Sequence, residues 1–472
     1  MIQQTPATEF AAGSYRDRTA RVFDLGGNRI GRALNDSAAD EWRHFSKSAC
    51  FEAMIERGNV VDSRELSPAE FSALDLPSWA VAALEHRRVP FVSYPYEWSF
   101  GMLRDAALLQ LRLLAECLDA GFIIKDASAY NTLFAGAQPV FIDVASFVRH
   151  IDGQPWAGYR QFCEMFLIPL LLQAHRGLPL QTVLKSDLEG WSPAVARKLF
   201  SYRDLFRAGV FKDVWIHGLC QQIASRGPAP AASSTSSLKF NTPSIRRNVT
   251  RLTRIVEHLT WSPPSTTWTT YNEAQSHVRK NYDFKSQFVD NVCRERRRAL
   301  VWDLGCNTGT YSRIASQYSD HVVAMDQDAG CVELLYRDLK ANGPANILPL
   351  TINLANSSPA HGWRGRERLR LEERGRPDLV LCLGLIHHLV IGCNIPLPEF
   401  VDWLASLSGD VVIEFPSKAD PMVRQLLATR VDQYDDYSLE SLKASLSEHF
   451  SIVRCEEVPA TERMLIHAVQ RI

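Results

Sequence analysis

One stretch of the chain, residues 300–311, constrains the fold more than any other. It begins as an apolar run that predicts a buried strand, and it continues through a turn with Gly305 and Gly309 into a helix. This order is typical of open α/β sheets that hold a nucleotide-like ligand at the carboxyl end of the first strand. The next apolar run ends in Asp326, at the spacing expected of a carboxylate that binds a ribose. We therefore expect a doubly wound α/β domain around this stretch.

The residues of the turn distinguish between two kinds of ligand. A dinucleotide fingerprint needs a glycine where the pyrophosphate touches the backbone, and Asn307 stands at that position here. Asp303 comes just before the turn, and its carboxylate would repel a pyrophosphate but attract a cationic amino group. The turn therefore favours a ligand with a positive charge over a dinucleotide.

Further landmarks follow at the ends of later apolar runs. Asn353 and Leu354 follow the third run, two histidines follow the fourth run near Leu383, and Glu414 lies in the fifth. In this order the chain from Asp303 onward resembles the class I methyltransferases that use S-adenosylmethionine. The resemblance implies a Rossmann-like sheet, an enzyme of this class and S-adenosylmethionine as its cofactor.

The resemblance also assigns a part of the cofactor to each landmark. The turn glycines and Asn307 would meet the methionine portion, with Asp303 near its amino group. Asp326 would bind the ribose, Asn353 and its neighbour would meet the adenine, and the end of the fourth strand would lie beneath the methyl group. The predicted cofactor-binding residues are Asp303, Gly305, Cys306, Asn307, Gly309, Asp326, Gln327, Asn353, Leu354 and Leu383.

Two histidines and a glutamate are the candidate catalytic residues: His387, His388 and Glu414. Methyl transfer from a sulfonium depends mostly on alignment, and a base is needed mainly when the acceptor is a hydroxyl. A neutral histidine suits proton removal near pH 7, although packing against the sheet and hydrogen bonds to the backbone explain the same residues. The predicted acceptor is an oxygen or nitrogen atom of a small molecule or glycan.

The composition limits the partners and the location of the chain. Its 472 residues allow roughly two to four domains, and its net charge of −1 argues against general nucleic-acid binding. The ten cysteines form no Cys-x-x-Cys pair, so neither a zinc site nor a disulfide framework is predicted. We expect reduced thiols, no membrane span and no signal peptide, and hence a cytoplasmic protein. The oligomeric state stays open.

A segment rich in proline, serine and alanine divides the chain. Such a composition cannot build a core, so residues 225–241 are predicted to be a linker. An α+β domain over residues 1–224 is expected before it, and a helical lid or connector (242–298) and the methyltransferase domain (299–472) after it. Within the last domain, the charged residues 362–376 are predicted to form a solvated helix. Three residues of the connector are candidates for the acceptor side, although helix packing and solvated surface explain them equally well: Tyr271, Tyr282 and Lys285.

The N-terminal domain contains a second pattern of polar residues. Asp126 and Asn131 lie five residues apart, and a later apolar run ends in Asp143. This order resembles protein-kinase-like and aminoglycoside-kinase-like folds, in which Asp126 would be the base and the other two would bind Mg²⁺. The same residues are equally explained as turn formers whose side chains hydrogen-bond the nearby backbone. Upstream, residues 90–94 are predicted to form a strand.

Other kinase landmarks are absent from the N-terminal sequence. It contains no glycine-rich loop that would cover phosphates, and the residues after Asp143 are Val-Ala rather than Phe-Gly. A degenerate kinase-like domain is therefore the favoured interpretation, with no metal site unless the domain is active. An Mg-ATP-dependent phosphotransferase or a nucleotide-sensing domain is the alternative function.

Four stretches together resemble bacterial proteins that join such an N-terminal region to a methyltransferase, among them the NoeA-like methyltransferases of nodulation. These stretches are residues 125–131, 141–143, 159–163 and 385–389. The resemblance extends from about residue 10 to the C-terminus. It implies methyl transfer in nodulation or secondary metabolism.

Overall fold

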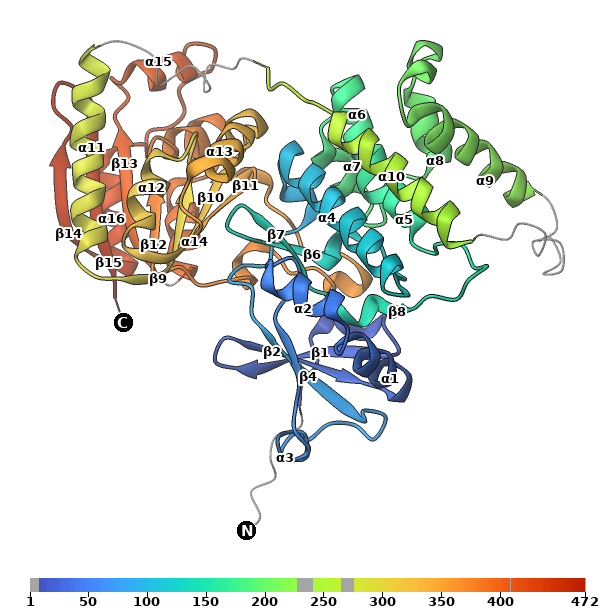
Figure 1. Cartoon of the computed structure of the whole chain (residues 1–472). Helices are drawn as coiled ribbons and strands as arrows, with labels where there is room; N and C mark the ends of the chain where they lie inside the picture. The colour runs from blue at the N-terminus through green and yellow to red at the C-terminus, as the bar shows by residue number, and fades with distance from the viewer. Residues whose placement is uncertain (1–7, 227–240, 265–275, 408, 472) are drawn as a thin grey trace. The chain divides into compact units, whose positions relative to one another are not determined.

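The computed structural model describes residues 8–226, 241–264, 276–407 and 409–471. The chain forms two compact units, whose elements are labelled in Figure 1. Unit 1 consists of Met1–Phe134, Pro139–Ser262 and His361–Arg368. Unit 2 consists of Ala135–Gln138, Pro263–Ala360 and Leu369–Ile472.

Unit 1 combines short strands with many helices. Its sheet elements are β1 (Ala20–Gly26), β2 (Arg29–Leu34), β3 (Ser63–Glu65), β4 (Ala82–Arg87), β5 (Phe122–Ile124), β6 (Thr132–Ala135), β7 (Gln138–Phe141) and β8 (Phe147–Arg149). Its helices are α1 (Asp36–Phe45), α2 (Ala49–Glu56), α3 (Pro68–Ser72), α4 (Phe100–Asp119), α5 (Tyr159–Phe162), α6 (Ile168–Arg176), α7 (Leu180–Ser186), α8 (Pro193–Ala196), α9 (His217–Arg226) and α10 (Thr242–His258). The turn between β6 and β7 belongs to unit 2.

The first four strands form an antiparallel sheet in the order β1-β2-β4-β3. The hairpin of β1 and β2 needs Gly31, because a Cβ atom there would lie 2.3 Å from the ring of Phe23 on the paired strand. Phe23 in turn packs in a buried cluster with Ala33 and Ala83. The absence of a side chain at Gly31 therefore lets the ring of Phe23 lie against the paired strand and join this cluster.

The helix α10 belongs to unit 1, whereas the sequence predicts a lid or connector over residues 242–298. Its apolar stripe, which includes Ile245, Val249 and Leu252, is buried, and the helix packs against α4. The sequence predicted helical structure here but not the surface that the helix covers. The predicted linker, residues 225–241, falls mostly outside the described residues.

Two predicted elements of the chain are wrong. Residues 90–94 form no strand, and the preceding strand, β4, ends at Arg87. Residues 362–376 form short 3₁₀ turns rather than a helix, because Gly362 and Gly365 adopt positive φ angles of 81° and 64°. This segment is also less solvated than expected, since Glu367 is buried in unit 1 and accepts hydrogen bonds of 2.8–3.0 Å from Arg16.

Unit 2 is built around one large sheet. Its strands are β9 (Arg298–Leu304), β10 (Ser319–Asp326), β11 (Ile347–Thr351), β12 (Leu379–Cys382), β13 (Asp410–Pro416), β14 (Phe450–Glu457) and β15 (Arg463–Gln470). Its helices are α11 (Ser276–Arg294), α12 (Thr310–Ser316), α13 (Ala329–Asn342), α14 (Leu397–Ser406), α15 (Pro421–Leu427) and α16 (Leu439–His449). Helices α12 and α13 pack on β9, β10 and β11, α11 packs on α12 and β15, and α14 packs on α16.

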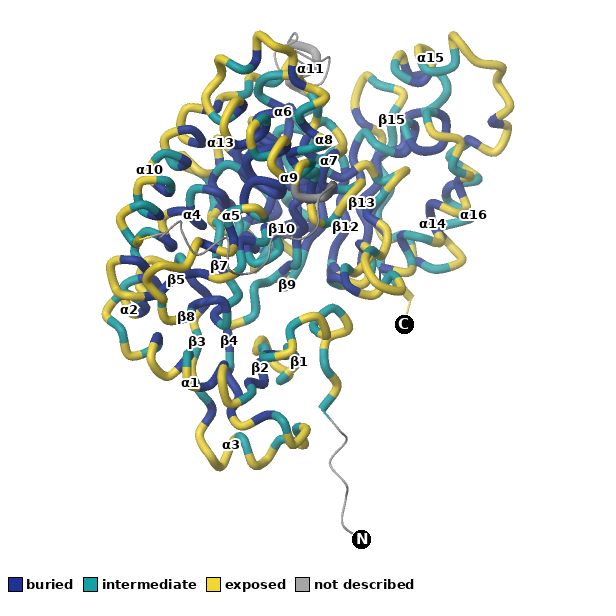
Figure 2. Tube along the Cα trace, turned by 90° about the vertical axis from the view of Figure 1, so that its right-hand side faces the viewer, coloured by how far each residue is buried: buried dark blue, intermediate teal, exposed yellow. Residues whose placement is uncertain are grey.

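The strand order of this sheet is β11-β10-β9-β12-β13-β15-β14. The first five strands are parallel, and β15 is antiparallel to both of its neighbours. The strands β12 and β13 are buried along their whole length, as expected of a parallel sheet covered on both faces (Figure 2). The connections reverse direction between β9 and β12, which creates a switch point at the carboxyl ends of the strands. The predicted fold class is confirmed.

Among the described residues, no helix is both long and apolar enough to cross a bilayer.

Candidate active site

A cavity of about 1310 Å³ opens at the carboxyl edge of the unit 2 sheet. The loops that follow β9, β10, β11, β12 and β13 contribute to its lining, together with α11 and the first residue of β15. The cavity therefore spans the switch point between β9 and β12, where doubly wound sheets bind their ligands.

The turn after β9 forms one wall of the cavity. Gly305 and Asn307 adopt left-handed backbone angles, with φ of 75° and 50°. The N–H groups of Gly305 and Cys306 donate to the Met325 carbonyl at 2.8 and 3.0 Å, and the N–H of Asn307 donates to Asp326 Oδ2 at 2.8 Å. These bonds tie the turn to the end of β10, so the backbone of the turn has one defined position beside the cavity.

Eight of the ten predicted cofactor-binding residues line the cavity: Gly305, Cys306, Asn307, Asp326, Gln327, Asn353, Leu354 and Leu383. The structure does not bring Asp303 to the cavity surface. That side chain is 1% exposed and accepts a hydrogen bond of 2.5 Å from Ser312 Oγ. Burial raises the pKa of Asp303 to about 7, although the bond from Ser312 opposes this rise. Asp303 therefore holds the start of α12 in place and does not line the cavity, and its contact with a cofactor stays a prediction.

Gly309, the other predicted residue outside the cavity lining, has a packing role. Its φ is 82°, and a Cβ atom there would lie 2.6 Å from Leu335 Cδ1 on α13. The glycine therefore allows α12 to begin close against α13, which is one of the known uses of a glycine in such a turn.

We expect Gly309→Ala to lower the free energy of unfolding by about 2–4 kcal/mol, from backbone strain plus overlap with Leu335. Gly305→Ala is the matched control, because Gly305 has φ of 75° but its Cβ would be 3.5 Å from Leu385, an ordinary contact. Gly305→Ala should lower the free energy of unfolding only by the backbone strain, about 1 kcal/mol. Urea unfolding of both variants measures the difference, and equal losses would contradict the packing role.

Asp326 lies at the end of β10 with its carboxylate at the cavity surface. Its Oδ1 accepts from the N–H of Asp328 at 2.8 Å, and its Oδ2 accepts from Asn307. Burial raises the pKa of Asp326 above the usual value, and these N–H donors oppose the rise. A carboxylate has about four acceptor positions, so Asp326 has capacity for a further hydroxyl donor from a ligand.

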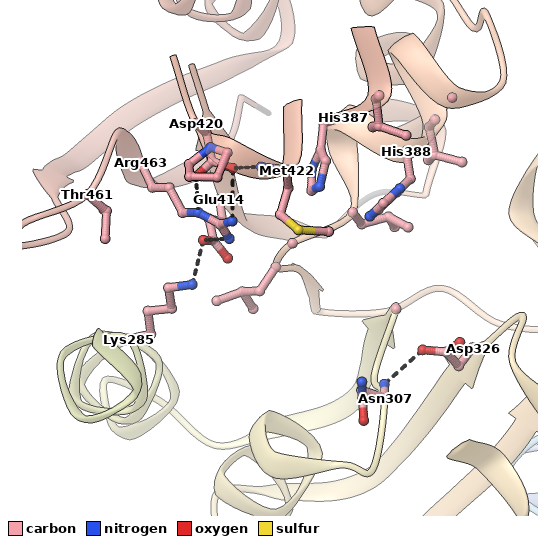
Figure 3. Close-up of a pocket in the computed structure, with 18 of the residues that line it drawn as sticks. Lys285, Asn307, Asp326, His387, His388, Glu414, Asp420, Met422, Thr461 and Arg463 are labelled. Carbon is pink, nitrogen blue, oxygen red and sulfur yellow. Dashed lines mark hydrogen bonds and ion pairs between the residues drawn. The ribbon is translucent and has the colours of Figure 1, made fainter. Parts of the chain in front are cut away.

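The opposite wall carries a cluster of four charged side chains (Figure 3). Lys285 Nζ on α11 donates to Glu414 Oε1 at 2.5 Å, and Arg463 NH1 donates to the same oxygen at 2.9 Å. Arg463 also donates to Asp420 at 2.7 and 3.2 Å. The cluster pairs two cations with two carboxylates, and Glu414 and Asp420 are 1% and 2% exposed.

The ion pairs decide the charge state of Glu414. Burial acts to raise the pKa of this carboxyl, but Lys285 and Arg463 outweigh burial and hold the pKa below its usual range. Glu414 is therefore ionised at pH 7, and the cluster as a whole carries no net charge. A buried charge of this kind is retained only with its partners in place.

His387 and His388 project from the loop after β12 toward the same space (Figure 3). Their ring centroids are 4.1 Å apart. Burial, with His388 and Arg463 as further causes, lowers the pKa of His387 to about 3, and burial also lowers the pKa of His388. Both imidazoles are therefore neutral at pH 7. His387 is 2% exposed, whereas His388 is half-buried, so His388 is the more accessible of the two.

The structure brings the three predicted catalytic residues to one wall and adds partners that sequence reasoning did not assign. Arg463 was missed, because it reaches Glu414 only through the antiparallel pairing of β15 with β13, which no local pattern marks. Tyr282 and Lys285 line the cavity, and Tyr271 lies outside the described residues. This wall of the cavity therefore depends on contacts between distant segments.

In unit 1, the residues of the predicted kinase-like pattern lie near the ends of short strands. Asp126 follows β5, Asn131 precedes β6, and Asp143 follows β7. Asp143 forms an ion pair of 2.7 Å with Arg32 on β2 and accepts a hydrogen bond from Ser146 Oγ. Burial raises the pKa of Asp126, and the nearby charge of Asp143 adds to this effect. The cation that contacts Asp143 here is an arginine, so the carboxylate is already neutralised. The kinase-like fold stays a prediction. No group of three or more His, Cys, Asp or Glu side chains suited to a metal occurs among the described residues.

No family model matches the sequence. The chain is 32% identical over 468 residues to the nodulation protein NoeA of Rhizobium meliloti strain 1021, covering 98% of this chain and 97% of that protein. Among solved structures it is similar to the N-methyltransferase NodS of Bradyrhizobium japonicum WM9, with a TM-score of 0.31, 11% identity and coverage of 41% of this chain and 97% of that one. It is also similar to magnesium protoporphyrin IX methyltransferase of Synechocystis PCC 6803, with a TM-score of 0.30, 19% identity and coverage of 42% and 89%.

The strand order, the turn after β9 and the cavity above the switch point give unit 2 the fold that the sequence predicts for it, that of the class I methyltransferases. Nearly the whole chain aligns with its nodulation relative at this identity. The chain belongs to the family of the nodulation protein NoeA.

Proposed function

We propose that the protein transfers a methyl group from S-adenosylmethionine to a hydroxyl group of a small molecule or glycan. One observation supports this most: a single cavity is lined on one side by the turn residues and Asp326, and on the other by His387 and His388. The loops proposed to bind the methyl donor and the side chains proposed to accept a proton therefore line the same cavity.

The cavity residues fit the cofactor of this class. The left-handed turn at Gly305 leaves backbone rather than side chain at the wall, and Asp326 has capacity for hydroxyl donors. Asn353 and Leu354 offer a polar and an apolar contact for a base. When bound, S-adenosylmethionine supplies a methyl group on a positively charged sulfur that is already a good leaving group.

The electrostatics of the far wall suit a cationic donor. The two histidines are uncharged at pH 7, and Lys285 and Arg463 are neutralised by Glu414 and Asp420. If either cation lacked its carboxylate partner, it would repel a sulfonium across a poorly solvated space. The ion cluster thus keeps two long cationic side chains from raising the potential of the cavity.

The proposed role of His388 is to hold the acceptor hydroxyl and take its proton as the new bond to carbon forms. It is neutral, it lines the cavity, and it is less buried than its neighbour. His387, with a pKa of about 3, is a poor base at pH 7 and is proposed to orient His388 and the loop after β12. An amine acceptor would need such a base less, so the histidine pair favours a hydroxyl.

We expect His388→Ala to lower the rate of methyl transfer by about 100-fold or more, the usual range for loss of a general base. The affinity for S-adenosylmethionine should change little. Single-turnover rates and calorimetric titration of the same variant separate the two effects. His449→Ala is the control, because that histidine is half-buried like His388 and pairs with Asp402, and it does not line the cavity. A rate within about threefold of the parent would contradict the base role.

The test of the proposed function begins with ligand binding by the full chain. A ligand at about 100 times its Kd stabilises a protein by about 2.7 kcal/mol, so S-adenosylmethionine and S-adenosylhomocysteine should each raise the melting temperature. Mg-ATP is the comparison, since a shift with Mg-ATP alone would support the phosphotransferase alternative. Metabolite comparison of a deletion strain would then identify the acceptor as a compound lighter by one methylene.

A further inference from the structure

An exposed apolar surface lies on unit 1, apart from every residue used above. Half of the strongly exposed large hydrophobic side chains in the described part of the chain fall within residues 195–223. Phe206 and Tyr202 are 94% and 78% exposed. Single exposed apolar side chains are common on protein surfaces, but a run of eight that includes two such exposed aromatic rings needs an explanation. We call this region the 195–223 surface, and its members are Val195, Leu199, Tyr202, Phe206, Phe211, Ile216, Leu219 and Ile223.

The helix of this region turns an apolar stripe outward. A π-helical turn, Val210–Ile216, leads directly into α9, and α9 packs beside α8 (Figure 1). Gly218 faces α8, because a Cβ atom there would lie 2.7 Å from the Pro193 carbonyl oxygen. Ile216, Leu219 and Ile223 follow at helical spacing and are 43–65% exposed. A surface helix normally carries polar residues on that face, so packing within unit 1 does not account for the stripe.

The charge exposed within this surface is positive. Its two acids, Asp204 and Asp213, are 3% and 0% exposed and are held in ion pairs. No ion pair joins Lys198, Arg203 or Lys212 to an acid in the described part of the chain, and all three are exposed. The basic residues of the 195–223 surface are Arg197, Lys198, Arg203, Arg207 and Lys212. Along the chain, residues 195–223 therefore interleave exposed apolar side chains with cations, although the chain as a whole has a net charge of −1.

We propose that the 195–223 surface binds a lipid bilayer that contains anionic lipids. Aromatic and aliphatic side chains interleaved with lysine and arginine are typical of helices that lie in a membrane interface. The apolar side chains would enter the boundary between headgroups and acyl chains, and the cations would contact lipid phosphates. A second copy of the chain fits poorly, since two such surfaces would face each other with like charges. A protein partner also fits less well, because lysine is depleted at protein interfaces and two of the three exposed cations without an ion pair in the described part of this surface are lysines.

The proposal is tested by sedimentation of the full chain with vesicles. Phosphatidylcholine vesicles with phosphatidylglycerol should bind the protein, pure phosphatidylcholine vesicles should bind it much less, and high salt should release it. Phe206→Ser should lower the partition coefficient by about tenfold or more. Lys212→Ser should lower it about fivefold, the effect of one cation near an anionic surface.

Ile151→Ser is the matched control, because Ile151 is also in unit 1 and is 61% exposed but lies outside this surface. It should bind vesicles like the parent chain. All variants should keep the parent melting temperature, since the changed side chains are exposed. Equal binding to both vesicle types, no binding to either, or parent-like binding by Phe206→Ser and Lys212→Ser would overturn the proposal. So would a dimer in solution that Phe206→Ser dissociates, which would assign the surface to self-association.

Discussion

Asp326→Ala is expected to weaken the binding of S-adenosylmethionine by about 100-fold to 10 000-fold. Hydrogen bonds to a charged carboxylate are worth about 1.5–3 kcal/mol each, and in the proposed function Asp326 accepts such bonds from the ribose hydroxyls of the cofactor. It also removes the acceptor for the N–H groups of Asn307 and Asp328, which loosens the turn against β10. Calorimetric titration with S-adenosylmethionine and with S-adenosylhomocysteine measures the loss, which should be similar for both.

Two variants separate the ligand effect from the structural one. Asp326→Asn keeps the shape and one acceptor oxygen, so its affinity should lie between those of the parent and the alanine variant. Asp338→Ala removes an exposed acid of α13 that pairs with Arg313, and it should leave affinity unchanged. If Asp326→Ala binds within about threefold of the parent while its melting temperature is also unchanged, Asp326 does not contact the cofactor.

The donor side of the cavity could be predicted because its signals are local. Gly305, Asn307, Asp326 and Asn353 each lie at the end of an apolar run or in the turn after it, and parallel strands bring their carboxyl ends to one edge. Asp303 lies two residues before Gly305, inside β9. Its side chain contacts Ser312 on α12 and does not line the cavity. A shift of two residues along a strand thus separates a cavity residue from a packing residue.

The acceptor side could be predicted only in part because it depends on pairing across long distances in the chain. Glu414 and the two histidines were found from their positions in or after strands, and Lys285 was a candidate on the predicted connector. Their pairing with Arg463 could not be predicted, because Arg463 is on the last strand. Helical structure was predicted for the residues of α10, while the packing of this helix on α4 could not be predicted. Periodicity therefore identifies which face of an element is buried, and the tertiary fold decides what covers that face.

Replacing Glu414 is expected to have the largest effect on stability in unit 2. Glu414→Gln leaves Lys285 and Arg463 opposite a single carboxylate, Asp420, in a buried site. Removing one partner of a buried ion pair costs about 3–5 kcal/mol, because the remaining charge is desolvated without compensation. Urea unfolding gives the total loss, and hydrogen exchange of the β9 and β13 amides reports on unit 2 alone. S-adenosylmethionine should also bind more weakly, since an uncompensated cation now borders the cavity.

The pH dependence of this loss has a definite sign. The pKa of Glu414 is lower in the folded chain than its usual value, so its contribution to stability is complete above the unfolded pKa of about 4.3 and is lost as the pH falls through the folded value. The stability difference between parent and Glu414→Gln should therefore be constant from pH 8 to about pH 6 and should shrink below about pH 4.

A second substitution tests whether charge balance is the cause. Lys285→Met in the Glu414→Gln background removes the excess cation and leaves the pair of Arg463 and Asp420 intact. The double variant should regain most of the stability lost by Glu414→Gln, because a methionine of similar length can pack where the lysine lay. If the double variant is no more stable than the single one, Glu414 stabilises unit 2 through contacts other than its ion pairs, and the cluster does not act as a neutral set of four charges.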